Sequence, residues 1–126
     1  MSMDLKNSKN EWCCFSNTGW AFYLNLAVDY GWKEAGTSAP KEWDISHGEW
    51  TGVYDWNAGQ IVSISDSENL VAALKAYLDD PDRRLKAEAL SKEFSENGIP
   101  VELDDSDRKF VEEFISFADK NSFEIW

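Results

Sequence analysis

The sequence is poor in the residues that much enzymatic and membrane chemistry requires. It has one histidine, two cysteines and no long apolar run, and a bilayer-spanning helix needs about 20 consecutive, mostly apolar residues. A nucleophilic arrangement based on histidine would have to use His47. The chain also lacks a nucleophile elbow, a phosphate-binding loop and a zinc-protease motif. We therefore expect no catalytic residues, no metal, no cofactor and no membrane span.

Basic residues are also scarce, with 12 Lys and Arg against 24 Asp and Glu, for a net charge of −12. An acidic surface repels phosphate groups, which argues against nucleic-acid and membrane-surface partners. The first eleven residues are polar and contain no apolar stretch of the signal-peptide type, so we expect a cytoplasmic protein. Cys13 and Cys14 are adjacent, and because a disulfide between neighbours is strained, we expect two reduced thiols.

Apolar and aromatic side chains, in contrast, are plentiful. They make up 43% and 14% of the 126 residues, enough to build the core of one domain. We expect a single domain over residues 1–126. Residues 1–15 are expected to be a partly flexible start, and residues 32–59, rich in Trp and Gly, an irregular segment.

Helical periodicity and end signals predict an α+β fold with four helices and a small antiparallel sheet. The predicted helices cover residues 17–30, 65–80, 82–97 and 106–120, and the predicted strands cover residues 60–64 and 123–126. Gly31 and Gly98 are expected to end two of the helices. A capping box from Ser65 to Glu68 is expected to begin another. In the third helix, we expect Leu85 and Ala89 to be buried.

Two Asp-Asp-x-Asp motifs, residues 79–82 and 104–107, precede predicted helices. Carboxylates at a helix start accept the free backbone N–H groups and complement the helix dipole, so helix capping explains both motifs. Neither has the glycine and glutamate spacing of a helix-loop-helix calcium site. Asp104, Asp105 and Asp107 are in addition a weaker candidate patch for a protein partner.

The most distinctive stretch interleaves large aromatics with acids. Aromatic rings supply contact area and carboxylates steer a cationic partner, so this stretch predicts a surface for a basic protein. The predicted partner-binding residues are Trp43, Asp44, Glu49, Trp50, Tyr54, Asp55 and Trp56. A second interpretation is that the rings only attach an irregular segment to the domain.

A different class of function uses the same aromatics. Trp32, Trp43, Trp50 and Tyr54 could wall a pocket in a small-ligand-binding protein or an unrecognised enzyme, with Asn57 and Gln60 orienting the ligand. Convergence of these side chains on one cavity would favour the pocket, whereas exposure of some of them on the surface would favour the protein interface. A subunit that only oligomerises is a third possibility, and the sequence leaves the oligomeric state open.

Several segments are similar to a pattern in small uncharacterised bacterial proteins. The pattern runs through Asn17-x-x-Trp20, Leu26-Ala27-x-x-Tyr30-Gly31-Trp32, Gly36-Thr37, Gly52-x-Tyr54, Asn57-x-Gly59-Gln60-x-Val62 and the closing Phe123-x-Ile125-Trp126. The resemblance implies a shared fold and brings no catalytic residue. By charge and size alone, the chain also resembles acidic immunity proteins of bacterial toxin systems. That likeness implies a non-catalytic inhibitor whose partner is a basic toxin domain.

Overall fold

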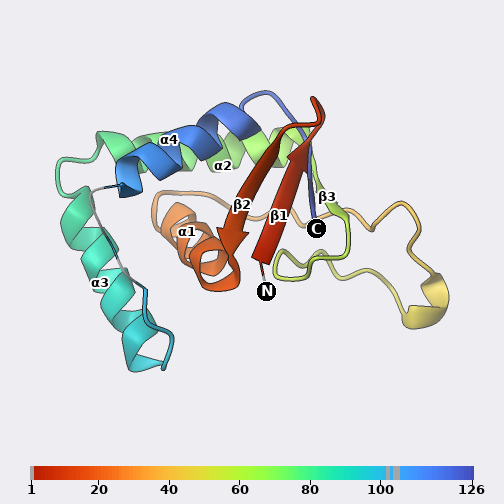
Figure 1. Cartoon of the computed structure of the whole chain (residues 1–126), viewed down its shortest axis with the longest axis horizontal. Coiled ribbons are helices and arrows are strands. Elements are labelled where there is room, and N and C mark those ends of the chain that lie inside the picture. The colour runs from red at the N-terminus through yellow and green to blue at the C-terminus, as the bar shows by residue number, and fades with distance from the viewer. Residues whose placement is uncertain (1, 102, 104–105) are drawn as a thin grey trace.

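The computed structural model of the chain describes residues 2–101, 103 and 106–126, which form an α+β fold (Figure 1). A four-stranded antiparallel sheet and four α-helices form within these residues, which confirms the predicted fold class. In chain order the elements are β1 (Ser2–Asn7), β2 (Trp12–Ser16), α1 (Asn17–Asp29), the 3-10 turn η1 (Ile45–His47), β3 (Gln60–Val62), α2 (Ile64–Asp79), α3 (Arg83–Glu96), α4 (Asp107–Ala118) and β4 (Phe123–Ile125).

The first strand lies inside the sheet, whose order is β2-β1-β4-β3. Leu5 of β1 pairs with Cys13 of β2 on one side and with Ile125 of β4 on the other. Met3, Leu5 and Asn7 are buried while the residues between them are partly exposed, the period-two pattern of a strand with one face on a core. Most of residues 2–15, for which we expected a partly flexible start, thus lie in two hydrogen-bonded strands of the sheet.

Local capping residues set the helix ends, and the predicted cap of one helix was wrong by two residues. Ser16 accepts the backbone N–H of Gly19 at 2.9 Å and begins α1. Gly31, with a φ of 100°, follows its last turn as predicted. The N-cap of helix α2 is Ser63, two residues before the predicted cap Ser65: Ser63 has an extended backbone and its hydroxyl accepts the N–H of Asp66 at 3.1 Å.

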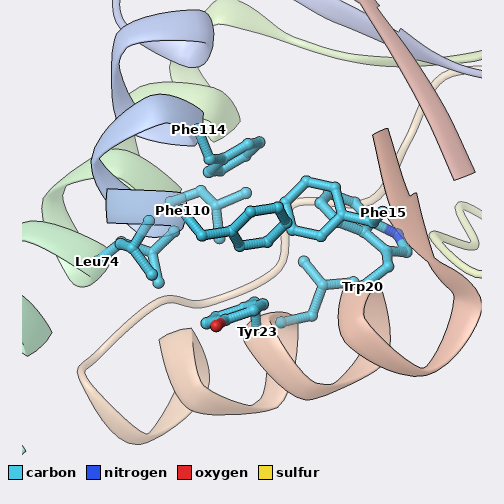
Figure 2. Close-up of a pocket in the computed structure, with 9 residues that line it drawn as sticks. Phe15, Trp20, Tyr23, Leu74, Phe110 and Phe114 are labelled. Atoms are coloured by element: carbon cyan, nitrogen blue, oxygen red, sulfur yellow. The ribbon is translucent and has the colours of Figure 1, made fainter. Parts of the chain in front are cut away.

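The core is an aromatic cluster centred on Phe15 of β2 (Figure 2). The Phe15 ring lies 5.2 Å from that of Trp20 on α1, and 4.8 and 5.5 Å from those of Phe110 and Phe114 on α4. The pairs with Phe110 and Phe114 are edge-on, an arrangement that suits the ring quadrupoles. The free space between the side chains of this cluster is about 10 Å³, room for roughly one water molecule, so it is packed core and not a ligand site.

Helix α3 lies at the edge of the molecule (Figure 1). It packs mainly against α1, where the ring of Phe94 lies 5.6 Å from that of Phe22. Leu90 is buried, but Leu85 is 68% exposed and Ala89 is exposed. The predicted burial of Leu85 and Ala89 was wrong, because a helix with so few neighbours covers only a narrow stripe of its surface.

Candidate functional site

Residues 37–59 form an excursion between α1 and β3 that stands out from the body of the fold (Figure 1). Two backbone hydrogen bonds of 2.8 and 3.0 Å join Ser38 to Ile61 and attach the start of the excursion to β3. Its outer part contains the single turn η1. We call residues 43–56, which include this turn, the aromatic loop.

Three indole rings hold the aromatic loop together. The ring of Trp50 lies 5.0 Å from that of Trp43 and 5.7 Å from that of Trp56. The indole N–H of Trp43 donates to the carbonyl of Gly48 at 3.0 Å, and that of Trp50 donates to the carbonyl of Thr37 at 3.1 Å. Trp43 and Trp50 are partly buried, whereas Trp56 is 50% exposed. The cluster therefore shapes the loop and still presents an indole to solvent.

The charges of this region are mostly negative and exposed. Residues 41–56 contain four acidic side chains and one basic side chain, and the predicted contacts Asp44, Glu49 and Asp55 are all exposed. The carboxylate of Asp44 accepts the N–H of Ser46 at 2.9 Å, which lowers its pKa and keeps it charged. Exposed carboxylates in the same loop as an exposed indole are a surface that attracts and contacts cationic groups.

Tyr54 lies apart from this surface. It is 6% exposed, and its hydroxyl donates at 2.5 Å to Oδ2 of Asp66 in the first turn of α2. The indole N–H of Trp32 donates to Oδ1 of the same carboxylate at 3.0 Å, and the backbone N–H of Gly36 donates to the Tyr54 hydroxyl. The structure thus argues against Tyr54 as a partner contact, because its hydroxyl attaches the base of the excursion to α2.

The residues of the alternative pocket are divided between two places. Trp32 and Tyr54 line a groove of about 520 Å³ against α1, whereas Trp43 lines a separate groove of about 500 Å³. Gln60 is fully buried, and its side chain donates to the carbonyl of Trp56. Asn57 is exposed. The buried amide of Gln60 serves the backbone of the loop, and this division gives little support to a single tryptophan-lined pocket.

The second candidate patch for a protein partner, Asp104, Asp105 and Asp107, is not supported as an exposed surface. Asp104 and Asp105 lie outside the described residues. Asp107 is buried, and its carboxylate accepts the hydroxyls of Tyr23 and Tyr77 at 2.5 and 2.7 Å and the guanidinium of Arg83 at 3.2 Å. Asp107 is thus an internal acceptor at the start of α4, and the structure argues against a surface role for it.

Among the described residues, the reactive side chains form no recognisable catalytic arrangement. Cys13 and Cys14 are free thiols, and burial raises the pKa of Cys13 to about 11, which disfavours the nucleophilic thiolate. His47 is exposed on η1, with its ring 6.1 Å from that of Trp43. Among the residues that the structure describes, no three His, Cys, Asp or Glu side chains are placed to hold a metal ion.

Within the described ranges, no helix has the length and apolarity needed to cross a membrane.

A groove that the sequence reasoning did not identify adjoins the aromatic loop. It is the groove of about 500 Å³, and its lining residues are Pro40, Lys41, Glu42, Trp43, Ala58, Gly59, Glu124 and Trp126. The alternation in the closing strand could have indicated the position of Trp126. Phe123 and Ile125 are buried, so Glu124 and Trp126 lie on the other face of the strand. Nothing in the sequence indicated that this face meets Trp43.

Comparison with protein-family models, with curated proteins and with solved structures gives no match to this chain.

Proposed function

We propose that this chain is a non-catalytic, cytoplasmic binding protein that recognises a basic protein by contact with the aromatic loop. In this proposal it acts as an immunity-type inhibitor that neutralises a basic bacterial toxin domain. The observation that supports it most is the half-exposed indole of Trp56 in the same loop as the exposed carboxylates of Asp44, Glu49 and Asp55.

Each part of this surface has a physical task in the proposal. The net charge of −12 accelerates the encounter with a basic partner, an effect that salt weakens. The indole of Trp56 loses its remaining exposed area on binding and provides the apolar anchor. Because Trp43 and Trp50 already fix the loop, little conformational entropy is lost when the partner binds.

The proposal is tested by isolating the partner and measuring its affinity. The untagged chain is purified from its native cell extract, and any basic protein recovered with it is purified and titrated by calorimetry. Trp56→Ala and Asp55→Lys should each weaken binding by roughly tenfold or more. Glu96→Lys, the same charge reversal at the end of α3, should change the affinity by no more than about twofold after correction for net charge.

Two outcomes would overturn the proposal. One is the recovery of no basic partner, together with no protection when neighbouring toxin genes are expressed. The other is a partner that binds Trp56→Ala and Asp55→Lys as tightly as the native chain. A small-ligand-binding protein or an unrecognised enzyme remains the second candidate, and a metabolite that competes with the partner or binds the groove against α1 would favour it.

A further inference from the structure

The groove beside the aromatic loop combines two indole rings with carboxylates. Trp43 and Trp126 both line it, and Trp126 is 46% exposed. Glu42 and Glu124 also line it, and Glu42 is exposed. Aromatic faces and carboxylates within one groove are the two kinds of group that stabilise a bound organic cation.

Glu124 is the best placed of these carboxylates. Its side chain is 22% exposed, so water screens it less than the acids of the loop. One oxygen accepts the indole N–H of Trp126 at 3.2 Å, and this bond orients the carboxylate relative to the ring. The other oxygen lies 3.7 Å from the ammonium of Lys41.

Lys41 lines the groove and places a cation near Glu124, but it pairs with that carboxylate only weakly. Its side chain is 79% exposed, and its distance to Glu124 is at the long end for an ion pair. This pair contributes little, because the exposed ammonium of Lys41 keeps most of its hydration at this distance and the lysine loses conformational freedom in forming the pair. A better-fitting cation from outside can therefore displace Lys41 at small cost.

The ring of Trp126 lies directly against the backbone of Gly59. Gly59 has a φ of 90°, and a Cβ atom built on it would lie 2.6 Å from Cη2 of the Trp126 ring. The indole therefore rests directly on the glycine backbone, in a position that any other residue would obstruct. A ring supported on one side in this way loses less conformational freedom when a ligand binds to it.

We propose that this groove binds the guanidinium group of an arginine side chain from the basic partner. A guanidinium is planar, stacks on an indole face and donates paired hydrogen bonds to a carboxylate, whereas an ammonium is a compact, strongly hydrated point charge. The groove thus distinguishes arginine from lysine, which the carboxylates of the aromatic loop alone cannot do. This inference rests on the proposed function, and Trp43 connects the groove to the aromatic loop.

The test uses small probes, so that it does not depend on isolating the partner. N-acetyl-arginine amide and N-acetyl-lysine amide are titrated into the full chain while the indole N–H resonances are followed by NMR. The arginine probe should shift the Trp43 and Trp126 resonances and bind roughly threefold or more tightly than the lysine probe.

Variants with opposite expected effects keep the test independent of folding defects. Trp126→Ala should weaken arginine binding roughly two- to fivefold, the value of one exposed cation–aromatic contact. Trp12→Ala removes an indole that is 56% exposed and lies outside the groove, and it should have no effect. Lys41→Gln should strengthen binding about twofold or more, because it removes the competing cation. Lys92→Gln makes the same charge change on α3 and should not strengthen it.

Equal shifts with both probes, or equal effects of Lys41→Gln and Lys92→Gln, would overturn the groove as an arginine site. Neither result would contradict the proposed function, because that proposal is tested separately by the effect of Trp56→Ala on binding of the intact partner. Conversely, arginine selectivity that depends on Trp126, found together with no recovered basic partner and no protection against neighbouring toxins, would establish the groove and overturn the proposed function.

Discussion

The hydroxyl of Tyr54 donates a hydrogen bond of 2.5 Å to Oδ2 of Asp66, and both side chains are buried. Tyr54 lies at the base of the aromatic loop, whereas Asp66 lies in the first turn of α2, where its own N–H is capped by Ser63. The carboxylate therefore connects a segment without regular structure to a rigid helix. This contact helps to fix the aromatic loop in a defined position.

The same chemistry recurs at every tyrosine of the chain. Each of the four tyrosines donates its hydroxyl to an aspartate: Tyr23 and Tyr77 to Asp107, Tyr30 to Asp80, and Tyr54 to Asp66. Three aspartates thus accept hydrogen bonds between elements that are distant in sequence. Part of the acidic excess is consequently structural and does not serve a partner.

Tyr54→Phe should destabilise the fold by about 1–3 kcal/mol, because it leaves a buried carboxylate with one donor fewer. Urea unfolding followed by circular dichroism measures the change. Tyr30→Phe is the matched control: it removes a hydroxyl that donates to a partly exposed Asp80, and water can replace it, so its effect should be smaller. Equal losses of stability in the two variants would contradict the structural role of the Tyr54 contact.

Alkaline pH should unfold the chain through its buried tyrosines. Burial, followed by the hydrogen bonds to Asp66 and Asp107, raises the pKa of Tyr54 and Tyr77 above the ordinary value of 10.0. The folded state then holds these protons more tightly than the unfolded chain. The free energy of unfolding should therefore be constant with respect to these groups below about pH 9 and fall above pH 10, by up to about 1.4 kcal/mol per pH unit for each tyrosine.

Urea titrations at several alkaline pH values measure this slope. Because lysines also titrate in this range, the informative comparison is between the native chain and Tyr54→Phe, whose slope should be shallower by up to about 1.4 kcal/mol per pH unit. A slope that is the same in both proteins would show that Tyr54 ionises in the folded state as freely as in the unfolded chain.

The helices were predictable because their signals are local. Ser16 and Gly31 delimit α1 through contacts within one turn, and the Pro81 region separates α2 from α3. Strands β1 and β2 were missed, although Met3 and Leu5 alternate with polar residues. A strand of five or six residues is stabilised by its neighbours in the sheet, and these can be distant in sequence. Leu5 of β1, for example, pairs with Ile125 of β4.

The position of the candidate site in the chain could be predicted, but the set of side chains that form it could not. The aromatic and acidic residues of the loop are contiguous, so composition alone identified them. The burial of Tyr54 depends on Asp66, whose residue type and place at a helix start equally suit an exposed cap. The contribution of Trp126 depends on the sheet bringing β4 beside the excursion, and no local pattern of the sequence encodes that proximity.

Asp107→Ala should destabilise the fold by about 3 kcal/mol or more, because two tyrosine hydroxyls and the Arg83 guanidinium lose their common acceptor. Chemical unfolding provides the measurement. Glu112→Ala on the same helix removes an exposed carboxylate that pairs with Arg108 at the surface, so it should cost less than about 1 kcal/mol. If Asp107→Ala instead left stability unchanged and weakened partner binding, the original assignment of Asp107 to a surface patch would be restored.

Gly59→Ala should destabilise the fold by more than Gly31→Ala, and the difference should vanish when Trp126 is removed. Both glycines have positive φ, 90° and 100°, so both substitutions carry a backbone cost of about 1 kcal/mol. A Cβ at Gly31 meets no atom within 4 Å, whereas one at Gly59 would lie 2.6 Å from the Trp126 ring. Unfolding measurements on Gly59→Ala in the native and Trp126→Ala backgrounds isolate this contact as a coupling energy. A coupling energy near zero would mean that the indole moves aside freely, and the groove would then lack the fixed wall on which its selectivity for arginine depends.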